Sequence, residues 1–467
     1  MTLYHAVTPA IIAELRQIAG AKNTIVDPEK MEPYSHDEVT DSRYHHCPEV
    51  VVLPETTAQV AQIIQLANRE LIPVIPRGGG TGLACGAVPL SGGLVLSLER
   101  MNRLLELNTD SMYMIVEPGV LTEEVQKAAK AAGLFYAGDP CSGDSCFIGG
   151  NAATNAGGNR AVKYGTTRDQ IYALEVVTPT GDIVRLGGRL EKVSTGYSLE
   201  QLIIGSEGTL GIITQLTLRL VPLPRHVTDL LAIFPTIETT IAMVGKIIRA
   251  GITPACIEFM DNATIQSVER FLNEKLPHSD QGHYLIVQLE GQSEDDLDDK
   301  SVLIDELCSE NGALTVLVAD SQKIWRARKA FAEAVRHESL VMSKEDIVVP
   351  VDQIPGMMED IARLSSEYGL TARTASHAGD GNIHLNLLRY DMAESDWDHT
   401  LDAFQHALYS LVYQRGGKLS GEHGIGYKRK QLMREFTPAS ELAMMQAIKK
   451  ALDPRLILNP GKIFDIV

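Results

Sequence analysis

A chain of 467 residues is too long for one ordinary domain, since roughly 100–200 residues per domain is usual, and two to four domains are expected. Its 44% hydrophobic and 22% charged residues indicate a globular protein. The net charge of −18 and the 5% of aromatic residues argue against nucleic acid, which needs clustered Lys and Arg and stacking rings. No stretch reaches the ~18 apolar residues of a membrane span, and six cysteines without paired spacing favour a reduced, cytoplasmic protein.

The first 100 residues predict two helices and several short strands. A helix begins after Thr8-Pro9, a capping threonine followed by a proline. An apolar strand in PEVVVLP, a helix in TTAQVAQIIQLANRE and a strand at residues 72–75 come next. Thr57 is the expected N-cap of the second helix. This strand, helix and strand begin an α/β unit that leads into a cluster of glycines.

The glycine cluster PRGGGTGLACG, residues 76–86, is the first candidate ligand site. Glycines allow positive φ and close approach, so several N–H groups after a strand can face a pyrophosphate. A Rossmann fingerprint does not fit, because after Gly80 and Gly82 the next glycine is Gly86, one residue late. A P-loop does not fit either, because no Gly-Lys-Ser/Thr follows. For this loop alone, a flexible turn remains the alternative.

Two further segments are also rich in glycine and small polar residues: SCFIGGNAATNAGGNRAVKYG from Ser145 and GSEGTLGIIT from Gly205. Three such segments in one region favour one extended ligand. Together, PRGGGTG, SCFIGGNAATNAGG and LIIGSEGTLGIIT resemble the FAD-binding domain of flavoenzymes of the vanillyl-alcohol oxidase type. That family binds FAD on an α+β domain that lacks the Rossmann fingerprint.

The resemblance implies positions for the FAD contacts, with the pyrophosphate against residues 77–83. Some relatives tether the flavin through a histidine in the first loop, but Gly78, Gly79 and Gly80 offer no such side chain, so a non-covalent FAD is implied. An ordinary surface charge is the alternative for Arg77. The implied contacts are Pro76, Arg77, Gly78, Gly79, Gly80, Thr81, Gly82, Leu83, Asp139, Pro140, Ser145, Gly149, Gly150, Asn155, Gly158, Gly165, Glu207, Gly208, Gly211, Ile212 and Asn459.

The composition of the sequence changes around Pro222–Pro224, where PLPRHVTDLLAIF indicates a linker followed by a new strand. Longer predicted helices and fewer glycines follow, until a glycine-rich segment begins again at Ser420. We therefore expect a first, FAD-binding domain of residues 1–222 and a second, substrate (cap) domain of residues 223–418. A C-terminal segment, residues 419–467, is expected to return to the first domain.

The segment HAGDGNIHLN, from His377, predicts a β-hairpin with two histidines. TARTAS before it and IHLNLL after it are strand-like, and GDGN indicates a turn. If residues 379–382 form this turn, His377 lies directly opposite His384, with Cβ atoms ~5 Å apart on one face. Two imidazoles at that separation can share a divalent metal ion, and Asn386 points to the same face. A buried, hydrogen-bonded pair of histidines is the alternative.

A third ligand is offered by SGEHGIG, which places Glu422 and His423 on a loop flanked by glycines. Histidine and carboxylate together suit Zn²⁺, Fe²⁺ or Mn²⁺. A solvated loop is the alternative from spacing alone.

HAGDGNIHLN, SGEHGIG and the terminal NPGKIF resemble the FAD-linked D-2-hydroxyacid dehydrogenases, a family that includes D-lactate dehydrogenase and the flavoprotein component of glycolate oxidase. The resemblance implies an α+β fold with an FAD-binding domain and an α+β cap domain built on an antiparallel sheet. It implies one divalent metal ion held by His377, His384 and Glu422, with His423 as the catalytic base. It implies that Arg328 and Lys344 bind the substrate carboxylate and that Asn386 hydrogen-bonds substrate. Ordinary surface charges are the alternative for Arg328 and Lys344.

The expected chemistry is oxidation of a 2-hydroxy acid, first of all D-lactate to pyruvate. The metal lowers the pKa of the substrate hydroxyl, His423 takes its proton, and the Cα hydrogen passes to the flavin as hydride. The chain has neither iron–sulfur ligands nor a nicotinamide fingerprint, and it is similar to the lactate-oxidising subunit that works with an electron-transferring flavoprotein by electron confurcation.

Three alternatives remain open. Within the same class, the chain could be a glycolate or D-2-hydroxyglutarate dehydrogenase that uses a quinone or another acceptor. A metal-dependent hydrolase would use the histidines and Glu422 but leaves three glycine-rich loops unexplained. A non-catalytic electron-transfer flavoprotein would leave the histidines without a role.

Overall fold

The computed structural model describes residues 4–39 and 41–466. They form two compact units. The first unit holds the residues up to Ala156, residues 166–223 and the residues from His423 onward. The second holds Gly157–Gly165 and Pro224–Glu422. No helix among the described residues is long and apolar enough to cross a membrane, and none of the six cysteines forms a disulfide.

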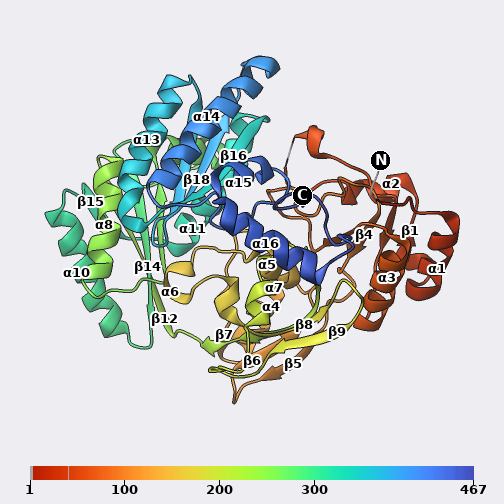
Figure 1. The fold of residues 1–467 in the computed structure, drawn as a ribbon. Helices are drawn as coiled ribbons and strands as arrows, with labels where there is room; N and C mark the ends of the chain where they lie inside the picture. The colour runs from red at the N-terminus through yellow and green to blue at the C-terminus, as the bar shows by residue number, and fades with distance from the viewer. Residues whose placement is uncertain (1–3, 40, 467) are drawn as a thin grey trace. The chain divides into compact units, whose positions relative to one another are not determined.

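The first unit begins with a four-stranded sheet in the order β1-β2-β4-β3 (Figure 1). β1 is antiparallel to β2, whereas β2, β4 and β3 run parallel, which confirms the predicted strand, helix and strand. The connecting helix α3 is capped by Thr56, whose hydroxyl accepts the N–H of Gln59, so the expected cap at Thr57 was one residue late. The bounds are β1 Thr24–Ile25, β2 Val50–Val52, β3 Val74–Arg77, β4 Leu94–Ser97, α1 Pro9–Ala19, α2 Pro28–Met31 and α3 Thr57–Glu70.

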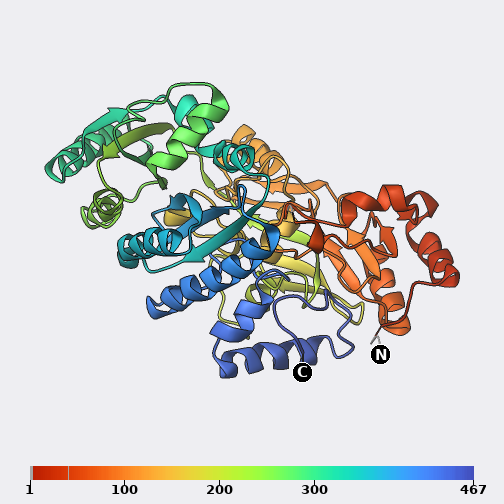
Figure 2. The ribbon, with the colours of Figure 1, turned by 90° about the horizontal axis from the view of Figure 1, so that it is seen from above.

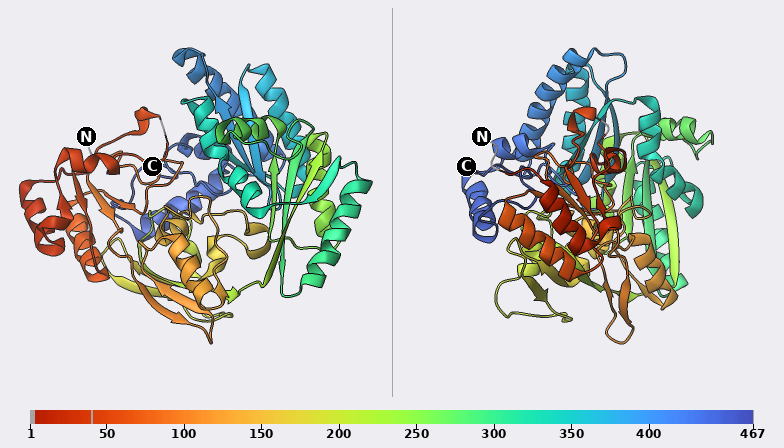
Figure 3. Two further views of the ribbon diagram at one scale, coloured as in Figure 1. Left: turned by 180° about the vertical axis from the view of Figure 1, so that it is seen from behind. Right: turned by 90° about the vertical axis from the view of Figure 1, so that its right-hand side faces the viewer.

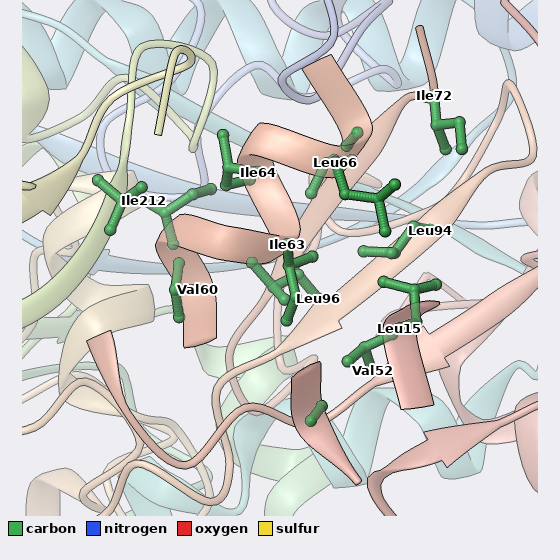
Figure 4. Close-up of a cluster of buried hydrophobic side chains, with 14 of the residues drawn as sticks. Leu15, Val52, Val60, Ile63, Ile64, Leu66, Ile72, Leu94, Leu96 and Ile212 are labelled. Atoms are coloured by element: carbon green, nitrogen blue, oxygen red, sulfur yellow. The ribbon is translucent and has the colours of Figure 1, made fainter. Parts of the chain in front are cut away.

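Apolar side chains of α3 hold this sheet in place. Val60, Ile63 and Ile64, at helical spacing, are fully buried against strand residues that include Val52 and Leu96 (Figure 4). Helix α1 packs beside α3 (Figure 3). Each fully buried aliphatic side chain contributes roughly 1.5–3 kcal/mol. The core therefore fixes β3, the strand from which the glycine loop emerges.

A second sheet of the first unit is antiparallel, in the order β5-β6-β10-β8-β9. Helices α4 and α5 pack on it through a separate apolar core. The bounds are β5 Leu104–Asn108, β6 Tyr113–Val116, β8 Ile171–Val177, β9 Ile183–Gly187, β10 Ile212–Arg219, α4 Thr122–Ala131, α5 Ile148–Thr154 and α7 Leu199–Ile203, with a small ladder of β7 Leu134–Phe135 and β11 Val221–Pro222.

The chain from His423 onward packs on the strand that precedes the glycine loop. It contains α15 (Lys430–Phe436) and α16 (Ala439–Leu452). Leu458 pairs with Val74 of β3 in a parallel bridge, and the N–H of Asn459 donates to the carbonyl of Val74 at 2.8 Å. Buried Lys449 of α16 donates to Asp453 and to the carbonyls of Thr209 and Leu458. These bonds join the C-terminal segment to the glycine-rich part of the first unit.

The second unit is one seven-stranded sheet in the order β15-β12-β14-β13-β17-β18-β16, antiparallel throughout, as predicted for the cap domain. Helices α8, α10, α13 and α14 cover one face, and α9, α11 and α12 form a group of their own (Figure 2). The strands are β12 His226–Phe234, β13 Cys256–Met260, β14 His283–Gly291, β15 Thr315–Val318, β16 Met342–Val348, β17 Thr371–His377 and β18 Asn382–Leu388. The helices are α6 Ala161–Tyr164, α8 Ile237–Arg249, α9 Asn262–Leu272, α10 Glu294–Glu310, α11 Ser321–Lys329, α12 Phe331–Glu338, α13 Ile354–Glu367 and α14 Glu394–Gln414.

Candidate functional site

The glycine loop of the first unit is built from backbone. In the part of the chain that the structure describes, the N–H groups of residues 78–83 donate no hydrogen bond. A Cβ on Gly79 would lie 2.6 Å from the carbonyl oxygen of Ser145, and one on Gly78 would lie 3.4 Å from the Cα of Gly150. At Gly79 the loop therefore packs against Ser145 only because the side chain is missing, whereas the contact at Gly78 is an ordinary van der Waals contact. Successive backbone N–H groups that donate to no protein acceptor can bind an anion such as a pyrophosphate.

Arg77 does not have the exposed position of an ordinary surface charge. Its side chain is buried, and its guanidinium donates to the carbonyls of His36 at 2.7 Å and Pro33 at 2.9 Å. It also lies over the ring of Tyr34. These contacts hold the guanidinium against residues 33–36.

Glu207 and Asn459 join the C-terminal segment to the predicted cofactor loops. The carboxylate of Glu207 accepts the N–H groups of Ile425 and Gly426, each at 2.8 Å. Burial raises the pKa of Glu207, although these two hydrogen bonds act against the rise. The Asn459 amide donates to the carbonyls of Gly86 and Glu207. The Glu207 carboxylate thus holds protein backbone.

The predicted FAD residues are divided between the units. All of them belong to the first unit except Gly158 and Gly165, which belong to the second. Asn155 has a positive φ of 52°, and its side-chain oxygen accepts the hydroxyl of Thr166 and the N–H of Arg168. This side chain therefore shapes its own loop.

The histidine hairpin forms, but with a register that differs from the prediction by two residues. His377 pairs with Asn382, and His384 pairs with Ala375, so the histidines are diagonal neighbours and not directly opposite. The turn comes earlier because the Asp380 carboxylate accepts the N–H of Asn382 and Gly381 takes a φ of 90°. A shift of two residues keeps every side chain on its face, so the two histidines still share one side of the sheet.

The two imidazoles converge on Glu422. The Nε2 atom of His377 lies 3.6 Å from Oε1 of Glu422, and Nε2 of His384 lies 3.3 Å from the same oxygen. The ring centroids are 4.9 Å apart and the rings are nearly perpendicular. Nε2 of His377 is buried and has no hydrogen-bond partner among the described residues. A buried imidazole nitrogen beside a second imidazole and a carboxylate fits a transition-metal site once the nitrogen has given up its proton.

Asp346 belongs to this cluster and was missed in the sequence. It lies opposite His384 on β16, and its carboxylate accepts the hydroxyl of Ser420 at 2.6 Å and the N–H of Glu422 at 3.0 Å. It also accepts the Asn382 amide at 2.7 Å. Ligand atoms of Asp346, His384 and Glu422 all lie within 4.8 Å of one another. Asp346 is therefore a fourth candidate ligand, and it also holds the loop that carries Glu422.

Opposite charges stabilise the cluster in the metal-free chain. Burial alone lowers the pKa of His377, but Glu258 and Glu422 outweigh it and raise this pKa well above 6.5. Burial raises the pKa of Glu422, but His377 and His384 outweigh it and lower this pKa to about 2. At neutral pH the site therefore holds a proton that a bound cation would displace.

The predicted substrate residues lie in the second unit with the histidines. Arg328 of α11 is buried, which excludes an ordinary surface charge, and it forms an ion pair with Glu258 at 2.8 Å. Lys344 and Asn386 are direct cross-strand partners, so their side chains share the face of Asp346 and His384. His423 follows Glu422 in the chain and is the first residue of the C-terminal part of the first unit.

Glu258 is a further residue that the sequence analysis missed. It is fully buried on β13, directly opposite His377, and its carboxylate lies 2.8 and 3.0 Å from Nδ1 of His377. The available signal was a single charged residue inside the apolar strand CIEFM, where an unpaired carboxylate is costly. Its partner, 119 residues further on, could not be read locally.

Comparison with known proteins gives matches over nearly the whole chain. The family model for the FAD binding domain matches residues 48–187, and the model for the C-terminal domain of FAD linked oxidases matches residues 223–463. D-lactate dehydrogenase from Anaerostipes hadrus is 38% identical, with 98% of each chain covered. Glycolate oxidase subunit GlcD from Bacillus subtilis is 34% identical, over 98% of this chain and 97% of the relative.

One further relative and one solved structure extend these matches. D-2-hydroxyglutarate dehydrogenase from Xanthomonas citri pv. viticola is 33% identical over 97% of each chain. The structure of p-cresol methylhydroxylase with substrate bound matches with a TM-score of 0.82 at 18% identity, over 97% of this chain and 96% of that one. The latter match shows the fold alone, and it confirms the predicted two-domain α+β fold.

Proposed function

This chain belongs to the family of FAD-linked oxidases, and we propose that it is an FAD- and metal-dependent dehydrogenase that oxidises D-lactate to pyruvate. The broader statement, an FAD-dependent 2-hydroxyacid dehydrogenase, follows from relatives that match over almost the full length of both chains. D-lactate is favoured because the relative named for it has the higher identity, 38% against 34% and 33%.

One observation carries the proposal beyond family membership. The buried Nε2 of His377 and the Nε2 of His384 both face Oε1 of Glu422, and Nε2 of His377 has no hydrogen-bond partner among the described residues. A purely structural histidine pair would satisfy its buried nitrogens. We infer that His377, His384 and Glu422 hold one divalent ion, Zn²⁺, Fe²⁺ or Mn²⁺, with Asp346 as a further candidate.

The residues of this chain would act on a 2-hydroxy acid as follows. Arg328 and Lys344 bind the carboxylate and orient the acid, and Asn386 donates a hydrogen bond to it. His423 takes the hydroxyl proton as a general base. When bound, FAD would accept the Cα hydrogen together with two electrons. The metal would supply positive charge where the hydroxyl loses its proton.

The FAD is proposed to bind non-covalently on the first unit. The undonated amides of residues 78–83 and the close packing of Gly78 and Gly79 on residues 145–150 support a pyrophosphate there. An electron-transferring flavoprotein is the proposed acceptor, in a cytoplasmic complex. A quinone is the alternative for a chain that oxidises glycolate or D-2-hydroxyglutarate.

Anaerobic titration of the purified protein tests these proposals. D-lactate, L-lactate, glycolate and 2-hydroxyglutarate are added separately, with and without a chelator, and the visible band of oxidised flavin is followed. We expect D-lactate to bleach the band at the lowest concentration and the chelator to stop the bleaching. A colourless protein would favour a metal-dependent hydrolase. Bound flavin that no hydroxy acid reduces, with metal present, would favour a non-catalytic electron carrier.

A further inference from the structure

Glu258 has two charged partners, and each belongs to a different part of the proposed site. Its carboxylate faces Nδ1 of His377 at 2.8 and 3.0 Å. It also accepts Nε of Arg328 at 2.9 Å and lies 2.8 Å from Nη2 of the same guanidinium. Glu258 has no exposed surface, and both partners are buried as well. One carboxylate therefore lies between a proposed metal ligand and a proposed substrate ligand.

We propose that Glu258 is a positioning residue that orients His377 toward the metal and Arg328 toward the substrate carboxylate. The inference rests on the proposed function and assigns to this residue a role in it. Glu258 does not touch metal or substrate in this assignment. It acts through the two side chains that do.

The effect on His377 follows from hydrogen-bond chemistry. An ionised carboxylate only accepts, so Nδ1 must carry the hydrogen, and in a neutral ring the lone pair is then on Nε2. Nε2 is the atom that faces Glu422 and lacks a hydrogen-bond partner among the described residues. Carboxylates placed behind metal-binding histidines fix the ring and raise its basicity. Glu258 would therefore strengthen metal binding without being a ligand.

The effect on Arg328 follows from the shape of the guanidinium. Glu258 accepts from Nε and lies against Nη2, which occupies one edge of a planar group with five N–H donors. Both contacts are made by Oε2 of Glu258, so one edge of the guanidinium is held and the remaining donors lie in the plane that this edge sets. The substrate carboxylate would therefore meet a guanidinium that is already oriented.

Asp229 offers a matched control for a merely structural role. It is also a buried carboxylate of this sheet, on β12, and it also holds α11, by accepting from Ser321 and Trp325. Its further partner is Gln288, and it touches neither histidine nor arginine in the contacts observed. Loss of Asp229 therefore perturbs the same sheet and the same helix without altering His377.

The test is Zn²⁺ binding by the full-length protein, purified with its flavin and stripped of metal, measured by competition with a chromophoric chelator. Glu258→Gln is expected to weaken Zn²⁺ binding about 10–100-fold, the usual cost of losing a partner behind a metal ligand. Asp229→Asn is expected to leave Zn²⁺ affinity at the parent value. With saturating metal, Glu258→Gln is also expected to raise KM for D-lactate through Arg328, whereas Asp229→Asn does not.

A double variant keeps the test informative if Glu258→Gln does not fold because it leaves a buried Arg328 unpaired. Glu258→Gln combined with Arg328→Met removes both charges, a change that buried ion pairs often tolerate. The double variant is expected to show the same loss of Zn²⁺ affinity. Parent-like affinity in either variant would overturn the inference while the proposed function stands. A parent that binds no Zn²⁺ would overturn both the metal assignment and this inference.

Discussion

The glycine loop of the first unit, where FAD is proposed to bind, and the histidine face of the second are built in opposite ways. The loop at residues 78–83 presents backbone N–H groups, and its close packing requires the absence of side chains. The histidine face presents side chains from adjacent strands, each held by a buried partner such as Glu258 or Asp346. A backbone site is damaged by adding atoms, whereas a side-chain site is damaged by removing them. The two sites should therefore fail separately and in different ways.

The largest expected effect comes from removing a metal ligand. Glu422→Gln and His384→Ala are expected to abolish stoichiometric metal and to reduce turnover of D-lactate by more than about 100-fold, the upper cost for a mere supporting partner. FAD content should remain that of the parent because the glycine loops are unchanged. Metal analysis and flavin absorbance of the same samples check both statements. Loss of flavin together with metal would contradict the separation of the two sites.

Removal of the proposed base comes next. His423→Asn is expected to lower turnover by about 10²–10⁴-fold, the usual contribution of a positioned acid–base group. The variant should keep its FAD, because its glycine loops are those of the parent. Anaerobic bleaching of flavin by D-lactate measures the half-reaction directly. Bleaching at the parent rate would exclude His423 as the base.

Alanine substitutions at two neighbouring glycines of the first unit can distinguish a proposed contact with FAD from a packing contact within the protein. A Cβ on Gly150 meets no protein atom within 4 Å, whereas a Cβ on Gly149 would overlap Pro118. Gly150→Ala is expected to weaken FAD roughly 10–100-fold by disturbing one or two hydrogen bonds to an anion, while the FAD-free protein is slightly stabilised. Gly149→Ala is expected to destabilise the FAD-free protein itself.

Thermal unfolding without FAD and titration with FAD distinguish these two alanine variants. Metal affinity should match the parent in both of them, because the histidine face is untouched. If Gly150→Ala binds FAD as tightly as the parent, the flavin does not approach α5 at this position, and the backbone half of the comparison would need revision.

The sequence was most informative where function depends on local backbone. The glycines of residues 78–80 identified the loop, because their missing side chains are visible in one short stretch. The prediction that His377 and His384 share one face of the sheet is confirmed, since a register error of two residues leaves that face unchanged. That error arose because a single carboxylate, Asp380, closes the turn early, which no periodicity reveals.

Contacts between distant parts of the chain could not be predicted in the same way. Glu258 and Asp346 lie opposite residues of neighbouring strands, and strand order is a property of the whole sheet. Arg77 was expected near phosphate, but its guanidinium binds the carbonyls of Pro33 and His36, more than 40 residues earlier. The tertiary fold determines which side chains become partners, whereas glycines that leave the backbone without side chains can be read directly from the local sequence.

The smallest effect expected is a pH dependence confined to the histidine face. In the metal-free protein the pKa of His377 is raised above 6.5, so its contribution to stability is full below that pH and is lost as the pH rises through the raised value. Zn²⁺ must displace this proton, so its affinity should increase with pH by at most about tenfold per unit. FAD affinity on the first unit should show no matching slope, because its proposed ligands are backbone amides that do not titrate. Titrations of Zn²⁺ and FAD at neighbouring pH values measure both slopes. Equal slopes for the two ligands would show that the sites are coupled and would remove the contrast between them.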